Sequence, residues 1–360
     1  MAEKISSIRT VGPNDAKSAI RFAMKVRRPI FMWGPPGIGK SDIIKQLGYE
    51  QEREVIDVRL SLWEPTDIKG IPYYNSQANT MTWAPPSELP SDPDSKAILF
   101  LDELNSAAPA TQAAAYQLIL NRRVGTYRLP DGVDIVAAGN READKGVTFR
   151  MPAPLANRFI HVELEVSFDD WHEWAVNNRQ HEQVVGFLGF SKQDLYDFDP
   201  KGASRSFATP RSWSFVSDLL HDSALSENTL TTLVAGAVGE GLAVKFMAHR
   251  KVAKQMPKPL DILEGKVTKT EIKEVSAMYS LTISMCYELQ ELNKKKVKDW
   301  DKMADCFFGF MMDNFPTELV VMGAKVALVN YQLPFDTTKL KNFDRFHEKY
   351  GKYIIQAMEG

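Results

Sequence analysis

Short apolar runs alternate with amphipathic stretches through residues 1–166 of this chain. Three of the runs are nearly continuous in apolar residues, which is typical of strands buried on both faces of a parallel sheet. The expected strands are Ile30–Trp33, Val55–Arg59, Ala97–Asp102, Val133–Asn140 and Phe159–Val166. Their alternation with helices predicts a layered α/β domain with a parallel five-stranded sheet flanked by helices.

From Ser167 onward the hydrophobic pattern has the period of helices. Ser167 and Asp170 are predicted to form a capping box at the start of the first of these helices. Thr209–Pro210 predicts another helix start, with threonine as the N-cap and proline at the first helical position. Further helices are expected to start near Thr268, Asp299 and Pro316.

A glycine-rich break follows the first expected strand and precedes a helix. It matches the pattern G-x-x-x-x-G-K-[ST] in the strand–helix context that this motif requires. Glycines let successive backbone N–H groups turn inward around an anion, and the positive end of the helix dipole faces the same point. The motif therefore predicts a site for nucleotide phosphates. Its residues are Gly34, Pro35, Pro36, Gly37, Ile38, Gly39, Lys40 and Ser41.

Polar side chains end two later strands, where parallel α/β sheets bind their ligands. Lys40 is expected to neutralise phosphate charge, and Ser41 to bind Mg²⁺ together with Asp102, the latter through water. Glu103 is placed to deprotonate an attacking water, which favours hydrolysis over transfer to another hydroxyl. Asn140 is expected to contact that water or the γ-phosphate, or else to cap the segment that follows it.

Composition adds little to this picture. The formal charge of −2, from 44 basic and 46 acidic residues, gives no global support for binding to nucleic acid. The two cysteines, Cys286 and Cys306, imply no disulfide framework and fit a reducing cytoplasm. The N-terminal stretch MAEKISSIRT has no apolar signal region, and no apolar run is long enough to span a membrane. A cytoplasmic location is therefore expected.

Taken together, these motifs resemble the AAA+ ATPases, and within them the MoxR type of the helix-2-insert branch. The resemblance covers about residues 12–250. FLDELNSAAPATQAAAYQLILNRRVG is similar to the family's Walker B strand and following helix, and LWEPTDIKGIP to its helix-2 insert. VGTYRLPDGVDIVAAGN resembles its hairpin before sensor 1. PLANRF and ATPRSW resemble the stretches that carry its arginine finger and its sensor-2 arginine.

The resemblance implies a P-loop core at residues 1–166, with an insert at about 61–90 and a hairpin at about 123–138. A helical lid at 167–258 and a helical C-terminal extension at 259–360 are expected to follow. Asp131-Gly132 is predicted to form the tip of the hairpin.

The same resemblance assigns roles to single residues. The loop from Gly34 to Ser41 becomes Walker A, Asp102 and Glu103 become Walker B, and Asn140 becomes sensor 1. Arg158 is the expected arginine finger, reaching the nucleotide of a neighbouring subunit, with Arg150 in reserve; the alternative is a surface arginine paired with an acid. Arg211 is the expected sensor 2. ATP and Mg²⁺ are the implied ligands.

Two further features leave alternatives open. The aromatic side chains of the insert, Trp63, Tyr73, Tyr74 and Trp83, either grip a polypeptide partner or cover a small core of the insert itself. The run KKKVK at residues 294–298 is either a basic patch or, more often for such runs, a solvated helix end.

The resulting hypothesis is a MoxR-type ATPase that forms a ring, expected to be a hexamer of identical chains, and remodels a protein partner. On family grounds that partner carries a von Willebrand factor A domain. An alternative is a motor or loader that uses the same engine on DNA or RNA, although no basic stripe supports it. A third is an ATP-dependent scaffold or switch.

Overall fold

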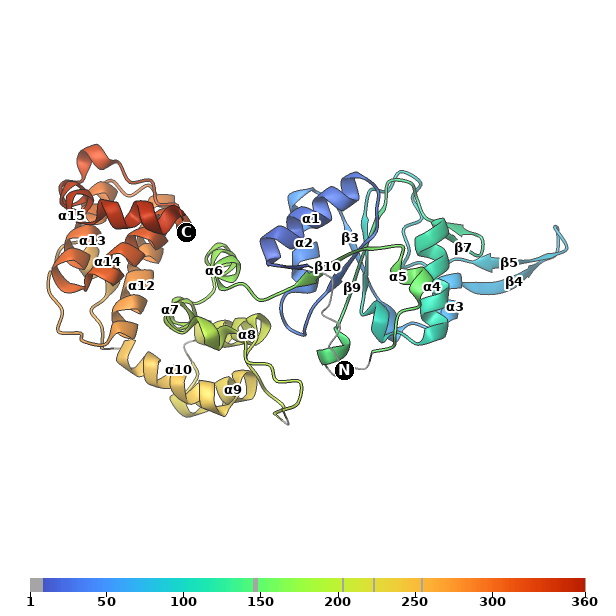
Figure 1. The fold of residues 1–360 in the computed structure, drawn as a ribbon, viewed down its shortest axis with the longest axis horizontal. Coiled ribbons are helices and arrows are strands. Elements are labelled where there is room, and N and C mark those ends of the chain that lie inside the picture. The colour runs from blue at the N-terminus through green and yellow to red at the C-terminus, as the bar shows by residue number, and fades with distance from the viewer. Residues whose placement is uncertain (1–8, 145–147, 203, 223, 254, 360) are drawn as a thin grey trace, which may run out of the picture. The chain divides into compact units, whose positions relative to one another are not determined.

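The computed structural model describes residues 9–144, 148–202, 204–222, 224–253 and 255–359 (Figure 1). The chain divides into two compact units, one of Met1–Asp170 with Asp199–Gly202 and one of Trp171–Phe198 with Ala203–Gly360. Residues 1–8, which include most of the N-terminal stretch considered above, lie outside the described part of the chain.

The first unit is built on a parallel sheet of six strands in the order β1-β10-β2-β9-β6-β3. The predicted α/β class, with a parallel sheet and a helical region after it, is confirmed. One strand of the sheet was not foreseen. It is the edge strand β1, which has only two residues, one of them exposed, so it leaves no apolar run in the sequence. The strands are β1 (Thr10–Val11), β2 (Ile30–Trp33), β3 (Val55–Arg59), β6 (Ile98–Asp102), β9 (Asp134–Gly139) and β10 (Ile160–Leu164).

Helices cover both faces of this sheet. Figure 1 shows α1 and α2 on one side and α4 on the other. Every residue of β6 and β9 is buried, which explains why these two strands are apolar at consecutive positions. The side chains of Leu99 and Leu101 belong to one buried cluster with Leu118 of α4. The helices of this unit are α1 (Pro13–Lys25), α2 (Lys40–Glu50), α3 (Pro65–Lys69), α4 (Pro109–Asn121) and α5 (Ala153–Ala156).

A small hairpin, β7 (Arg123–Val124) with β8 (Tyr127–Arg128), precedes β9. Its tip is Gly125-Thr126 and not Asp131-Gly132, so that prediction is wrong. A two-residue hairpin of the Asp-Gly kind needs positive φ at both residues, and neither Asp131 nor Gly132 has it. Instead, the N–H of Val133 bonds to the carbonyl of Pro130 at 3.1 Å, which closes a turn that leads into β9.

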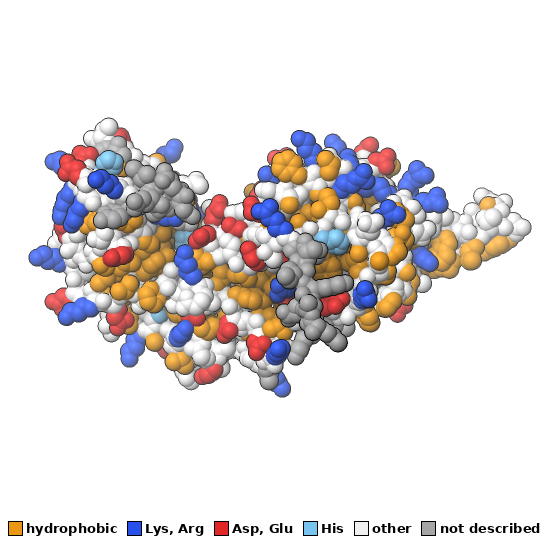
Figure 2. All heavy atoms as spheres, in the orientation of Figure 1, with side chains coloured by type: hydrophobic (Ala, Val, Ile, Leu, Met, Phe, Trp, Pro, Cys, Tyr) orange, Lys and Arg blue, Asp and Glu red, His pale blue; other side chains and the backbone are white. Residues whose placement is uncertain are grey.

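The insert forms a second, longer hairpin from β4 (Ile71–Asn75) and β5 (Thr80–Ala84). Tyr73 and Tyr74 are 50% and 66% exposed, so these two do not cover a core of the insert. Tyr74 lies opposite Met81, which is 67% exposed. Apolar side chains are visible along this hairpin in Figure 2. Trp63, by contrast, packs against the buried cluster of the first unit.

Among its described residues, the second unit contains helices and no strands. Thr209 caps α8 as predicted: its hydroxyl accepts the N–H of Ser212, and the Ser212 hydroxyl accepts the N–H of Thr209. In the part of the chain that the structure describes, no helix combines the length and apolar character needed to cross a bilayer. The helices are α6 (Phe168–Asn177), which begins in the first unit, α7 (Glu182–Phe190), α8 (Pro210–His221), α9 (Glu227–Val238), α10 (Glu240–Ala253), α11 (Pro259–Leu263), α12 (Val275–Lys294), α13 (Trp300–Asn314), α14 (Thr317–Lys325) and α15 (Lys341–Glu359).

The helix expected to start near Thr268 begins at Val275. The reason is a tertiary contact that the local sequence does not contain. The side chain of Asn314, at the end of α13, donates to the carbonyl of Thr268 at 2.9 Å and accepts the N–H of Thr270 at 2.9 Å. These bonds hold the segment in a non-helical path. The run KKKVK begins at the exposed end of α12, as the solvated-end interpretation requires.

Two histidines, the buried His249 and the partly buried His181, have lowered pKa values in the second unit. The ring of His249 lies 5.4 Å from that of Phe187, and its Nε2 lies 2.7 Å from the hydroxyl of Ser280. Burial lowers the pKa of His249 to about 4. Burial, followed by the charges of His221 and Arg250, lowers the pKa of His181 to about 4 as well.

We expect the free energy of unfolding to fall as the pH drops from about 6.5 to about 4. In that window the unfolded chain binds protons on these histidines that the folded chain does not bind, at a cost of up to about 1.4 kcal/mol per pH unit for each. Denaturant titrations at pH 7 and pH 4.5 measure this loss. His249→Gln should reduce the loss, whereas His347→Gln, at an exposed position, should leave it unchanged. An equal loss in both variants would contradict the assignment to His249.

Candidate functional site

The predicted phosphate loop joins β2 to α2 at the carboxyl edge of the sheet. The N–H of Gly34 bonds to the carbonyl of Gly139 at 3.2 Å, which fixes the start of the loop against β9. Gly37 and Gly39 have φ of 76° and 92°, a region open to glycine at no steric cost. Gly39 is also the N-cap of α2, so the first free N–H groups of this eleven-residue helix face the loop.

The side chains of the loop are already engaged. The ammonium of Lys40 donates to the carbonyls of Gly34 and Pro35 at 2.6 and 2.9 Å, and to Oδ1 of Asn140 at 2.9 Å. The hydroxyl of Ser41 donates to Oδ2 of Asp102 at 2.8 Å. The structure thus brings together residues of three segments that lie as far as 100 positions apart in the chain.

Glu103 is held in an unusual backbone conformation beside Asp102. Its φ is 54°, in the left-handed region that residues other than glycine seldom adopt. Its N–H donates to Oδ1 of Asp102 at 2.9 Å, and its carboxylate accepts the hydroxyl of Ser61. Ser61 follows β3, the neighbour of β6 in the sheet. The sequence indicates this contact between Ser61 and Glu103 only through the position of Ser61 just after a strand.

Asn105 is a second residue that the sequence did not single out. It is 1% exposed, and its Nδ2 donates to the backbone carbonyl of Asn140 at 2.7 Å. Its Oδ1 lies where a Cβ on Gly139 would come within 2.1 Å, so only glycine fits there. Asn105 therefore ties the end of β9, and with it Asn140, to the segment after Glu103.

The two arginine candidates for the finger are both exposed. Arg158 precedes β10, and β10 pairs in parallel with β2 so that Ile160 lies opposite Ile30. Arg158 therefore lies at the amino edge of the sheet, whereas the phosphate loop follows the carboxyl end of β2. Arg158 is level with Arg28 in this register, and Gly34 lies six residues further along the chain, which is about 20 Å at 3.3 Å per residue. The structure does not bring Arg158 to the loop of its own chain. Arg150 lies between the end of β9 and α5.

Arg211 lies in the second unit, in the first turn of α8, and is exposed. It comes directly after the N-cap Thr209 and the proline at the first helical position, as the sequence indicated. Its role as sensor 2 stays a prediction.

The residues present fit a nucleotide with a divalent cation. A Cβ on Gly34 would lie 2.6 Å from Cδ1 of Ile38 and 3.3 Å from the carbonyl oxygen of Leu164, so glycine lets the loop pass close to β10. The hydroxyl of Ser41 and the carboxylate of Asp102 are hard oxygen donors of the kind that Mg²⁺ prefers. Partial burial raises the pKa of Asp57 on the adjacent strand β3, and the negative charge of Asp102 raises it further.

Comparisons with known proteins agree with this geometry. Residues 29–159 match the family model of the AAA domain, dynein-related subfamily. Midasin of Giardia intestinalis is 28% identical over 189 residues, which are 49% of this chain and only 4% of that protein.

Solved structures resemble the chain more distantly. A Cytophaga hutchinsonii protein assigned as an ATPase is 12% identical with a TM-score of 0.35, covering 89% of this chain and 81% of that one. RuvB from Thermotoga maritima, a Holliday junction branch migration motor, is 17% identical with a TM-score of 0.36, covering 84% and 86%. Whole chains superpose poorly at such scores. The family match falls on the segment that holds the phosphate loop, Asp102, Glu103 and Asn140. Residues 29–159 are therefore similar to an AAA domain, and the chain spans only 4% of the length of the midasin that it matches.

Proposed function

We propose that this protein is a MoxR-type ATPase that hydrolyses ATP at the interfaces of a ring of identical chains, expected to be a hexamer. The observation that carries the proposal is the place of Arg158. It lies at the opposite edge of the sheet from the phosphate loop, and its guanidinium has no hydrogen-bond or ion-pair partner among the described residues. Because Arg158 does not reach the phosphate loop of its own chain, its exposed guanidinium is available to bind the nucleotide of a neighbouring chain.

Each group of the site has a definable part in hydrolysis. The N–H groups at the start of α2 and the ammonium of Lys40 bind the phosphates. Ser41, and Asp102 through water, would hold Mg²⁺, which would neutralise phosphate charge. Glu103 accepts a proton from the attacking water, and its contact with Ser61 fixes the carboxylate before water arrives. Asn140, tied down by Asn105, presents its side chain toward Lys40 and the γ-phosphate.

The work done with this energy is the remodelling or activation of a protein partner. The exposed apolar side chains of the β4–β5 hairpin support contact with a polypeptide. The resemblance to MoxR proteins supports a partner with a von Willebrand factor A domain. Stimulation of ATP turnover by such a domain, and not by DNA, would distinguish this function from a nucleic-acid motor.

Lys40→Ala is expected to weaken ATP binding roughly 10- to 100-fold, because hydrogen bonds to charged groups contribute about 1.5–3 kcal/mol. Since assembly is expected to depend on bound nucleotide, this variant should also fail to gain mass when ATP is added at a concentration that saturates the wild type. Fluorescent-nucleotide titration and light scattering measure the two effects. Lys45→Ala, at an exposed position of the same helix, is the matched control. A wild-type protein that stays monomeric when saturated with ATP would contradict the ring.

A further inference from the structure

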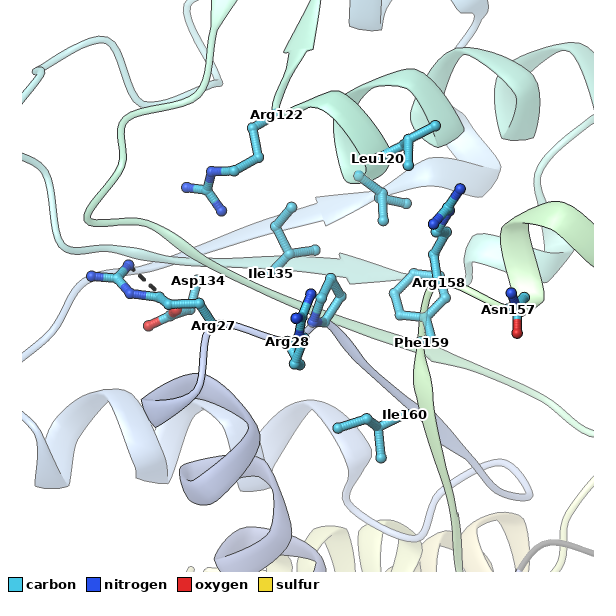
Figure 3. Close-up of a pocket in the computed structure, with 12 residues that line it drawn as sticks. Arg27, Arg28, Leu120, Arg122, Asp134, Ile135, Asn157, Arg158, Phe159 and Ile160 are labelled. Atoms are coloured by element: carbon cyan, nitrogen blue, oxygen red, sulfur yellow. Dashed lines mark ion pairs between the residues drawn. The ribbon is translucent and has the colours of Figure 1, made fainter.

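A surface cavity of about 390 Å³ lies at the amino edge of the sheet, around the starts of β2, β9 and β10. Figure 3 shows Arg28, Arg122 and Arg158 reaching it from three separate segments, around Ile135 and Phe159. A fourth arginine, Arg27, also lines it, together with a single carboxylate, that of Asp134. Four guanidinium groups against one carboxylate give the cavity an excess of three positive charges.

Two of these arginines are committed to the fold. Arg27 pairs with Asp134 at 3.6 Å and donates to the carbonyl of Asp131 at 2.6 Å. Arg122 donates to the carbonyls of Pro130 and Val133 at 2.6 and 2.7 Å. Burial lowers the pKa of Arg122, and the charge of Arg27 lowers it further, so the positive groups of the cavity repel one another.

The other two arginines are uncommitted and lie side by side in register. In residues 9–144, 148–202 and the rest of the described chain, neither Arg28 nor Arg158 has a side-chain hydrogen bond or ion pair. Ile30 lies opposite Ile160, and the N–H of Ile160 bonds to the carbonyl of Pro29 at 2.9 Å. Arg28 and Arg158 therefore stand at equivalent positions before two adjacent strands, whose axes are about 4.8 Å apart.

Two unpaired guanidinium groups that line one cavity suit an anion with several oxygens and more than one charge. A guanidinium binds phosphoryl oxygens through a fork of N–H donors. A ligand with one carboxylate would balance only one of the three excess positive charges. A terminal phosphate carries more negative charge and presents three oxygens to the N–H donors of the two guanidinium groups. The chemistry of the cavity thus favours a phosphoryl group.

We propose that Arg28 acts together with Arg158 on the terminal phosphate of the nucleotide held by a second copy of this chain. This inference rests on the proposed function, since it requires the ring. During hydrolysis the water oxygen bonds to the γ-phosphorus, the bond to ADP breaks with its electron pair staying on ADP, and the proton goes to Glu103 of the copy that holds the nucleotide. Arg28 exchanges no proton; it binds the charge that spreads over the γ-phosphoryl oxygens.

The test is a mixing experiment with purified full-length variants. Arg28→Ala is expected to lower kcat roughly 10- to 100-fold while its affinity for ATP stays at the wild-type value. Addition of an equal amount of Glu103→Gln, which is expected to bind ATP without hydrolysing it and which keeps Arg28, should restore about one quarter of the wild-type rate in randomly mixed rings, because half of all sites are intact and half of those face an intact arginine pair. Arg28→Lys should retain part of the activity, since it keeps the charge and loses the fork.

Two controls distinguish the proposed role of Arg28 from the proposed ring ATPase function on which it rests. Arg123→Ala changes an exposed arginine that does not line the cavity and should hydrolyse ATP at the wild-type rate. Arg158→Ala mixed with Glu103→Gln tests the ring itself. Rescue of Arg158→Ala without rescue of Arg28→Ala overturns the role of Arg28 and leaves the function standing; this result is also expected if the cavity binds free phosphate instead. If neither variant is rescued, both proposals fail.

Discussion

Glu103→Gln is expected to bind ATP with wild-type affinity and to hydrolyse it about 100 to 10,000 times more slowly. Glutamine has nearly the same size and can still accept the hydroxyl of Ser61, so the backbone of the site should be retained. The amide, however, cannot take the proton that the attacking water loses. Filter binding measures retained ATP, and single-turnover release of phosphate measures the chemical step.

Ser61→Ala provides a comparison for this result. It keeps the carboxylate of Glu103 and removes only its hydroxyl partner, so it should slow hydrolysis much less than Glu103→Gln. Normal turnover in Glu103→Gln would show that another group is the base. Loss of ATP binding in the same variant would place Glu103 in nucleotide binding instead.

Arg158→Ala is expected to lower kcat about 1,000- to 100,000-fold, the range found for arginines that act on a phosphoryl group from a neighbouring chain. Its affinity for ATP should stay close to the wild-type value, because Arg158 lies at the other edge of its own sheet. Steady-state turnover at saturating ATP measures the effect, and light scattering establishes that the ring still forms.

Arg150→Ala is the matched variant for this experiment. Arg150 is exposed like Arg158, and the two residues flank the short helix α5, Arg150 before it and Arg158 after it. It should retain most of its activity. A reversed pattern, with a large loss in Arg150→Ala and full activity in Arg158→Ala, would move the finger to Arg150 and would remove the support that Arg158 gives to the ring.

The features that the sequence revealed are those encoded over short distances. The loop from Gly34 to Ser41 is legible because glycine spacing, a lysine and a hydroxyl lie within eight consecutive positions. The central strands could be predicted because strands that are buried on both faces have apolar residues at consecutive positions. Capping at Thr209 is likewise a matter of four neighbouring residues.

What the sequence hid depends on contacts between distant segments. Asp131-Gly132 has the composition of a hairpin tip, but the pairing of the next residues in the central sheet decides its conformation. Thr268 looks like a helix start until Asn314 binds its carbonyl. The order and register of the strands determine the contacts of Ser61 and Asn105. They also determine the alignment of Arg28 with Arg158. A single sequence does not contain that information.

The resting partners of Lys40 have a consequence for the speed of the cycle. Because its ammonium already bonds to two carbonyls and to Asn140, arriving phosphates exchange one set of bonds for another and gain less net free energy than a bare ammonium would give. Under the proposed function, the same acceptors would be open to the ammonium again when ADP leaves, so release of the product would not leave the charge of Lys40 without partners.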